Sequence, residues 1–157
     1  MDRKSKLNAL LVCVILFTVA AVASILITQE DATVPGTTGH IVLSEILASN
    51  RTYPAPNGQY LDFIEVRDLS GTPTDISGYM LSDDSNSIGY TFPACTILQP
   101  NGYALCWCWK DAESVDFATF GISRDGGDMI CLYNSANVMV DSKEVPRMEA
   151  NVSLIRL

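Results

Sequence analysis

The sequence predicts an all-β sandwich preceded by one N-terminal transmembrane helix, and three observations lead to this prediction. Residues 7–28 are almost entirely apolar and carry no charge. After residue 39, short strand-like runs recur roughly every twelve residues, with turn-forming residues between them. Outside residues 7–28, no stretch of eleven or more residues shows the 3.6-residue period of a helix. Several short strands separated by turns are typical of two β-sheets packed face to face.

The apolar segment 7–28 is long enough to span a bilayer. As a helix it would cover roughly 33 Å at about 1.5 Å per residue, against a hydrocarbon core of about 30 Å. Three basic residues lie within residues 1–6, whereas Glu30 and Asp31 follow the segment. Because basic flanks stay in the cytoplasm, we expect residues 1–6 to be cytoplasmic and residues 29–157 to lie outside the cell membrane.

A cleaved signal peptide is the alternative interpretation of this segment, and it would make the protein secreted. Residues 21–23, Ala-Val-Ala, fit the small-residue cleavage pattern. However, residues 25–27, Ile-Leu-Ile, continue the apolar run, so a cleaved product would begin with an apolar stretch. We therefore favour a single-pass signal-anchor helix over residues 7–28, followed by a polar linker over residues 29–39.

The acidic balance of the chain disfavours one class of partner. The whole chain carries a formal charge of −8, from 10 basic and 18 acidic residues. Three of the basic residues and one acid precede residue 7, so residues 29–157 retain 7 basic and 17 acidic residues, a charge of −10. Such a field repels phosphate backbones, and no cluster of Lys or Arg offsets it there. We therefore expect no nucleic-acid binding.

Seven strands are expected after the linker. We assign them to residues 40–48, 60–66, 75–82, 88–92, 102–109, 128–133 and 138–145. Turn formers set their boundaries, namely Asn57-Gly58, Ser70-Gly71, Pro93, residues 100–102, Gly126-Gly127 and residues 134–137. In the second run Ile64 and Val66 share one face, opposite to Glu65, because side chains alternate along a strand.

Six carboxylates lie between Tyr60 and Asp84, which raises the question of a catalytic site. They fall at strand ends, on one outer face and in two loops, with no shared helical spacing or strand face. Glycosidase-type catalysis needs two carboxyls roughly 5 to 9.5 Å apart across a cleft, which this scatter does not indicate. The one histidine, His40, lacks a nucleophile motif. We therefore expect these acids to face water, and we predict no catalytic residue and no cofactor.

Calcium binding is an alternative use of the acidic loops. Residues 83–86, Asp-Asp-Ser-Asn, together with Asp125 and Asp128 supply hard oxygen donors. Their spacing lacks the regular pattern of an EF-hand loop, and Asp and Asn side chains commonly bond to backbone groups within turns. We favour simple turns and predict no metal ligand, and we keep a calcium-stabilised adhesion module as an alternative.

Four cysteines follow the linker, and their pairing stays open. They are Cys95, Cys106, Cys108 and Cys131. On a strand, Cys106 and Cys108 point to the same face about 7 Å apart, at the limit for bridging each other. A disulfide from either one to Cys95 or Cys131 is one interpretation, and four free thiols acting as small buried hydrophobic side chains is the other.

The two tryptophans alternate with cysteines in the fifth expected strand. Trp107 and Trp109 share one face of that strand. Because aromatic side chains dominate protein cores, we expect at least one of them to be buried in the core or at its rim. An exposed aromatic platform for binding is the alternative.

The order of several short motifs resembles the lamin tail domain. Residues 62–66, DFIEV, are similar to its D-W-I-E-L strand, and residues 75–83, DISGYMLSD, to its D-L-S-G-[WY]-x-L-S-D segment. Further matches in the expected order are His40–Ile46, Phe92-Pro93, Gly102-Tyr103, Gly127–Tyr133 and Val140-Asp141. The resemblance covers residues 40–146, and residues 147–157 resemble the connector that follows the domain in multidomain relatives. A truncated product and a stand-alone form are the two interpretations of this end.

The resemblance implies an immunoglobulin-like β-sandwich without intrinsic catalysis. Prokaryotic members are often exported and joined to other domains, such as a spore-coat-type kinase or a hydrolase. We therefore expect a membrane-anchored, extracytoplasmic module at the cell surface that binds or scaffolds a protein or glycan partner and contacts the bilayer through residues 7–28. The alternative from such relatives is that the chain is the N-terminal fragment of a larger surface enzyme whose catalytic domain is absent.

Overall fold

The computed structural model describes residues 40–84 and 87–156. The expected membrane helix over residues 7–28 and the linker over residues 29–39 lie outside the described residues. Within the described ranges all regular secondary structure is β-strand. In the same ranges, no helix meets the length and hydropathy of a membrane span. The expected all-β class is therefore confirmed for this part of the chain.

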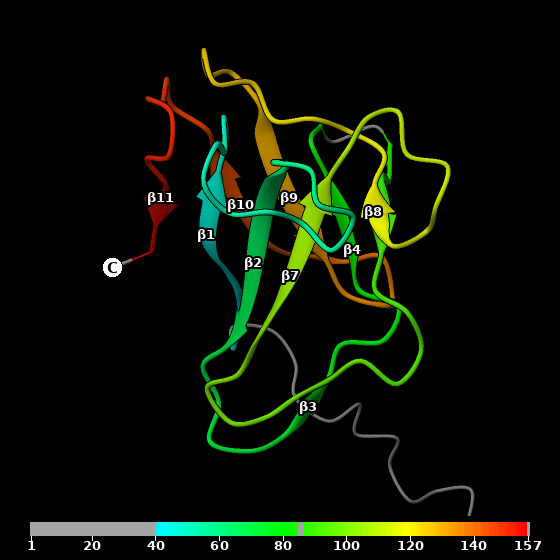
Figure 1. The fold of residues 1–157 in the computed structure, drawn as a ribbon. Coiled ribbons are helices and arrows are strands. Elements are labelled where there is room, and N and C mark those ends of the chain that lie inside the picture. The colour runs from blue at the N-terminus through cyan, green and yellow to red at the C-terminus, as the bar shows by residue number, and fades with distance from the viewer. Residues whose placement is uncertain (1–39, 85–86, 157) are drawn as a thin grey trace, which may run out of the picture. The chain divides into compact units, whose positions relative to one another are not determined.

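The larger sheet has five strands in the order β11-β1-β2-β7-β8 (Figure 1). Their bounds are Leu154–Ile155 for β11, Ile41–Leu47 for β1, Asp62–Asp68 for β2, Tyr103–Cys108 for β7 and Phe117–Ala118 for β8. Neighbouring strands are antiparallel except β7 and β8, which run parallel. Strand β2 lies in the middle, where Ile64 is opposite Ile46 on one side and Cys106 on the other.

A second sheet has four antiparallel strands in the order β10-β9-β4-β5. Their bounds are Met139–Glu144 for β10, Met129–Tyr133 for β9, Met80–Ser82 for β4 and Tyr90–Thr91 for β5. A separate pair is formed by β3, Thr74–Asp75, and β6, Ile97–Leu98. Figure 1 shows β3 beyond one end of the two main sheets.

One hydrophobic core lies between the two main sheets. The larger sheet contributes Leu43, Ile64 and Cys106, and the smaller sheet contributes Leu81, Ile130 and Leu132. All six side chains have no exposed surface. Burying each such aliphatic side chain favours folding by about 1.5–3 kcal/mol. Two sheets that share one core make a β-sandwich, as the strand pattern predicts.

The strand pattern differs from the expectation in two respects. The expected strand over residues 75–82 is interrupted, because Gly78 has a φ of +75° and the Tyr79 N–H turns back to the carbonyl of Ile76. Its residues are divided between β3 and β4. Strands β6, β8 and β11 were not expected. Each has only two residues, which is too short for an alternating pattern to show.

The segment after residue 146 packs against the sandwich. Met148 is buried in the core, and β11 pairs with β1. The backbone N–H of Arg156 donates to the carbonyl of Ser44 at 2.8 Å. Its guanidinium donates to the carbonyl of Leu43 and forms an ion pair with Asp141 of β10. Residues interpreted as a connector thus cover the edge of β1.

Candidate functional site

Asp68 corrects the expectation that the acids between Tyr60 and Asp84 face water. It ends β2 and has no exposed surface. Its carboxylate accepts hydrogen bonds from the Ser70 N–H at 2.7 Å and the Ser70 hydroxyl at 2.9 Å. Burial alone would raise the pKa of Asp68, but these bonds and one from Thr74 outweigh it and lower the pKa. Asp68 therefore organises the turn between β2 and β3.

Asp62 is a second acid that is withdrawn from water. It is half-buried at the start of β2. Burial raises its pKa, although backbone N–H groups of Asn50 and Ile122 partly offset that effect by donating to its carboxylate. Its contacts are with the backbone of two loops, so it holds those loops together rather than forming a site.

The acidic loops considered for calcium lie partly outside the described residues, because residues 85 and 86 are among those not described. The Asp128 carboxylate accepts from the Ser123 N–H at 2.6 Å, and Asp125 lies beside Arg124. Burial raises the pKa of Asp83, with the charges of Asp84 and Asp128 adding to the effect. Over the described ranges, no group of three or more His, Cys, Asp or Glu side chains could hold a metal ion.

Three of the four cysteines are buried, and two of them, Cys106 and Cys108, belong to the core between the sheets. Cys106 and Cys108 share the inner face of β7, as their spacing predicts, and Cys131 lies on β9. Cys95 is exposed, so the interpretation as small buried side chains is confirmed for three thiols and wrong for Cys95. Burial raises the pKa of Cys108 and of Cys131, which keeps these thiols neutral.

Neither tryptophan belongs to the core, so this part of the expectation of a tryptophan in the core or at its rim is wrong. The inner face of β7 belongs to the cysteines, and Trp107 and Trp109 are half-buried on the opposite side. The Trp107 ring packs edge-on against Phe63 at 5.4 Å between ring centroids, and Trp109 packs in the same way against Phe117 at 5.7 Å. Each tryptophan thus packs on the outer surface of the larger sheet.

An open groove runs along β5, outside the core. One hollow of about 340 Å³ lies between residues 88–91 and the loop that leads into β8. A second of about 600 Å³ lies between residues 91–94 and the same loop. Thr91 and Val115 line both hollows, so the two form one surface. We call this surface the edge groove, and it consists of residues 77–78, 88–94, 112–117 and 119.

Two sheet edges meet at the edge groove. Strand β5 is the last strand of the smaller sheet, and β8 is the last strand of the larger one. They are joined where the N–H and the hydroxyl of Thr119 donate to the carbonyl of Gly89, at 2.9 and 3.1 Å. Phe120 packs so closely that a Cβ on Gly89 would lie 2.3 Å from its ring. A glycine at position 89 therefore allows this junction.

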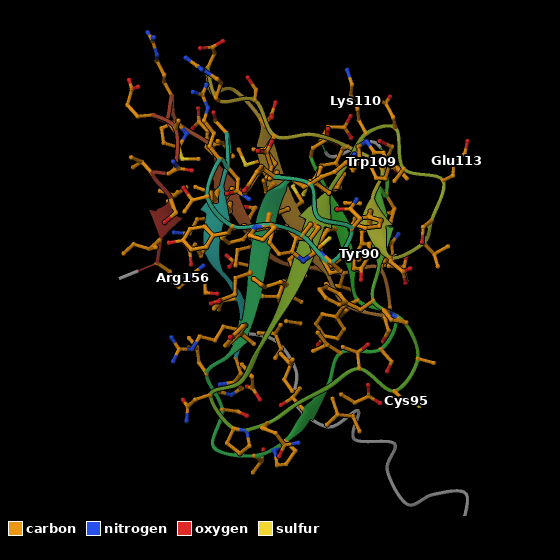
Figure 2. The ribbon with its side chains drawn as sticks, viewed as in Figure 1. Tyr90, Cys95, Trp109, Lys110, Glu113 and Arg156 are labelled. Carbon is orange, nitrogen blue, oxygen red and sulfur yellow. The ribbon has the colours of Figure 1, made fainter. Side chains whose placement is uncertain are left out.

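The surface of the groove is apolar with an acidic border. The side chain of Val115 is 88% exposed and that of Ile88 is 44% exposed. Glu113 and Asp116 belong to the lining, which contains no basic residue. In Figure 2, Glu113 lies at the outer tip of the loop and Tyr90 lies nearer to the sheets. Exposed apolar side chains gathered beside charges are typical of binding surfaces.

Tyr90 supplies a polar group at the base of the groove. It is half-buried and its ring packs edge-on against Phe92 at 5.1 Å. Burial raises the pKa of Tyr90 to about 12, with Cys106 and Asp116 contributing. The phenol therefore stays neutral and can donate a hydrogen bond at physiological pH. Together the groove offers apolar contacts, carboxylates and hydroxyl groups, which suit binding.

Sequence reasoning did not find the edge groove. Residues 88–92 were expected as a strand, but nothing indicated that this strand ends its sheet. The available signal was Val115, an isolated apolar residue inside the acidic loop KDAESVD of residues 110–116. His40, the one histidine of the chain, is exposed at the start of β1 and does not line the groove.

Comparison with known proteins adds one finding. The family model described as the Lamin Tail Domain matches residues 35–146, which is more than half of the 157-residue chain. The match confirms the resemblance that the ordered motifs indicate. Domains of this family are immunoglobulin-like and non-enzymatic, in agreement with the two packed sheets. Curated proteins gave no match.

Proposed function

The chain belongs to the lamin tail domain family, and from this premise we propose that it is a non-catalytic binding module that holds a partner in its edge groove. The partner is a protein or a glycan outside the cytoplasm. Residues 7–28 anchor the module in the cell membrane as a single signal-anchor helix. The protein thus connects a bilayer to an external partner and carries out no reaction.

The observation that carries this proposal is the exposure of apolar side chains in the edge groove. Val115 projects almost fully into solvent between two hollows, and Ile88 is exposed beside it. The exposed apolar surface is costly in water, and its burial by a partner would favour association. The anchor and the external location are supported by the apolar run over residues 7–28 and by its basic N-terminal flank.

Site-specific photo-crosslinking in intact cells tests the proposal. We expect a photoreactive amino acid at position 115 of the full chain to give a defined crosslinked product. The same amino acid at position 144 should give none, because Glu144 is exposed on β10, at the opposite edge of the smaller sheet. In parallel, the detergent-purified full chain is applied to a glycan array, with Val115→Ser as the control variant. A chain that yields neither a position-specific product nor glycan binding sensitive to Val115→Ser has no partner in this groove.

A further inference from the structure

We propose that the edge groove takes a short extended peptide, with both apolar and basic side chains, as an added strand beside Thr91. This inference rests on the proposed binding function and names the class of partner. It commits to a basic peptide segment rather than to a glycan, a nucleic acid or a second copy of this chain. Three features of the groove support it.

The first feature is the direction of the backbone groups of β5. The Phe92 N–H donates to the carbonyl of Tyr79, and its carbonyl accepts from the Gly78 N–H, so both groups of Phe92 face β4. Consecutive residues of a strand direct their N–H and C=O groups to opposite sides. The N–H and C=O of Thr91 therefore point away from β4, into the edge groove.

The second feature is that the same edge already accepts a chain segment. The Gly89 carbonyl, two residues before Thr91, points to the same side and is bonded by Thr119. On the other side of Thr91, Pro93 has no N–H to offer. Among the described residues Thr91 is thus the position of this edge with both backbone groups directed at the groove. An added strand would make one pair of backbone bonds there, so a short peptide suffices.

The third feature is the chemistry on either side of Thr91. One hollow lies beside residues 88–91 and the other beside residues 91–94, so an added strand would run past both, and Thr91 lines each of them. In the first hollow, Ile88 and Val115 provide apolar contacts and Glu113 provides a carboxylate. In the second hollow, Val115 provides an apolar contact and Asp116 provides a carboxylate. Lysine or arginine is therefore the complement of this groove.

Charge also disfavours a second copy of the chain and nucleic acid as partners. The described residues 40–84 and 87–156 hold 15 acidic and 7 basic side chains, a charge of −8. A second copy of the chain would bring the same negative field to the groove, and nucleic acid would bring phosphates. A basic peptide is attracted by that field at long range, and its association should weaken as salt screens the attraction.

Defined peptides test this inference on the full chain kept in a nonionic detergent. The probe is a fluorescein-labelled, eight-residue peptide of alternating valine and lysine, followed by fluorescence anisotropy, with detergent alone as the blank. We expect binding of this peptide and at least about tenfold weaker binding when glutamate replaces lysine. Two further peptides are methylated on backbone nitrogens, one at its valines and the other at its lysines. Only one of them should lose binding, because an added strand pairs through one edge.

Variants of the chain assign the peptide to Thr91. Thr91→Pro removes the N–H that faces the groove, a change that edge strands tolerate, and should weaken binding at least about tenfold. Thr91→Val keeps the N–H, and its affinity for the peptide should stay within about twofold of the wild type. Asp116→Lys should weaken binding about tenfold, whereas Glu144→Lys at the opposite edge should change it less than about threefold. Circular dichroism confirms that each variant is folded.

The outcomes separate this inference from the proposed function. Equal binding by Thr91→Pro and the wild type, or equal effects of the two N-methylated peptides, would overturn strand addition. Equal affinity for the glutamate peptide would overturn the charge preference. If no peptide binds while position 115 still crosslinks to a partner in cells, the inference fails and the proposed function stands. If crosslinking and glycan binding also fail, both fail.

Discussion

Asp68 illustrates how a single acidic residue can be structural in this protein. Its carboxylate has no exposed surface, yet it stays charged because Ser70 and Thr74 donate hydrogen bonds to it. A buried charge without such donors would be costly, so the turn that follows β2 and the carboxylate depend on each other. The neighbouring sequence, DLSGTPT of residues 68–74, supplies these donors within a few residues.

Replacing Asp68 should therefore destabilise the fold in a pH-dependent manner. The folded pKa of Asp68 is lowered, so its stabilising effect is fully present above its unfolded pKa of about 3.9 and is lost as pH falls through the lower folded pKa. We expect Asp68→Asn to lower the free energy of unfolding by about 2 kcal/mol at pH 7, and the difference from the wild type to shrink below about pH 4.

Urea denaturation from pH 2 to pH 7 measures this effect. Asp75→Asn is the matched control, because Asp75 accepts analogous bonds from Ser77 but is exposed at the end of β3. Asp75→Asn should lower the free energy of unfolding clearly less than Asp68→Asn does. Equal losses from the two variants would contradict a special role for the buried carboxylate.

At the scale of elements, two-residue strands decide how the sheets end. Strand β8 brings Thr119 and Phe120 to β5 on one side of the sandwich, and β11 brings Arg156 to β1 on the other. Exposed strand edges are open to unwanted pairing, and short covering segments limit that exposure. Among the described residues of the β5 edge, Thr91 lacks such cover, and the edge groove lies there.

The close contact at Gly89 predicts a large effect of a small substitution. Gly89→Ala would place a Cβ 2.3 Å from the buried ring of Phe120. Because the ring must then be displaced, we expect the free energy of unfolding to fall by about 1–3 kcal/mol. Gly71→Ala is the control, since its Cβ would meet no atom within 4 Å. Thermal and chemical unfolding compare the two. Similar stabilities of both variants would show that Phe120 moves aside without cost.

Arg156 should secure β11 against β1. Arg156→Ala removes the bond from its Nε to the Leu43 carbonyl, 3.2 Å, and the ion pair with Asp141. Asp141 of β10 also accepts a hydrogen bond from the Leu43 N–H of β1 at 2.8 Å, so losing Arg156 should weaken this contact between the two sheets. We expect the free energy of unfolding to fall by about 1 kcal/mol and the amide of Leu43 to exchange hydrogen faster. Arg147→Ala, at another exposed arginine, should change neither the free energy of unfolding nor hydrogen exchange at Leu43. Unaltered exchange at Leu43 in Arg156→Ala would refute the role of β11.

At the scale of the whole molecule, the proposed arrangement is an acidic sandwich held at a membrane. Cys95 provides a test of its location, because it is the exposed cysteine among the described residues, whereas Cys106, Cys108 and Cys131 are buried. We expect a membrane-impermeant maleimide to label the chain on intact cells after mild reduction. Cys95→Ser should abolish that labelling. Labelling that requires cell lysis would place the sandwich in the cytoplasm and contradict the proposed orientation.

The sequence by itself determined the strand-forming runs, the inner face of β2 and the family. These follow from local alternation of apolar residues and from the order of short motifs, both of which can be read along the chain. The tertiary structure alone decided that cysteines rather than tryptophans fill the inner face of β7, that Asp68 is buried, and that Thr91 faces an open edge. Each of these depends on which distant segments meet, such as Gly89 with Thr119 or Leu43 with Arg156. A pattern along one strand does not specify its neighbours, so the strand pattern by itself could not have located the edge groove.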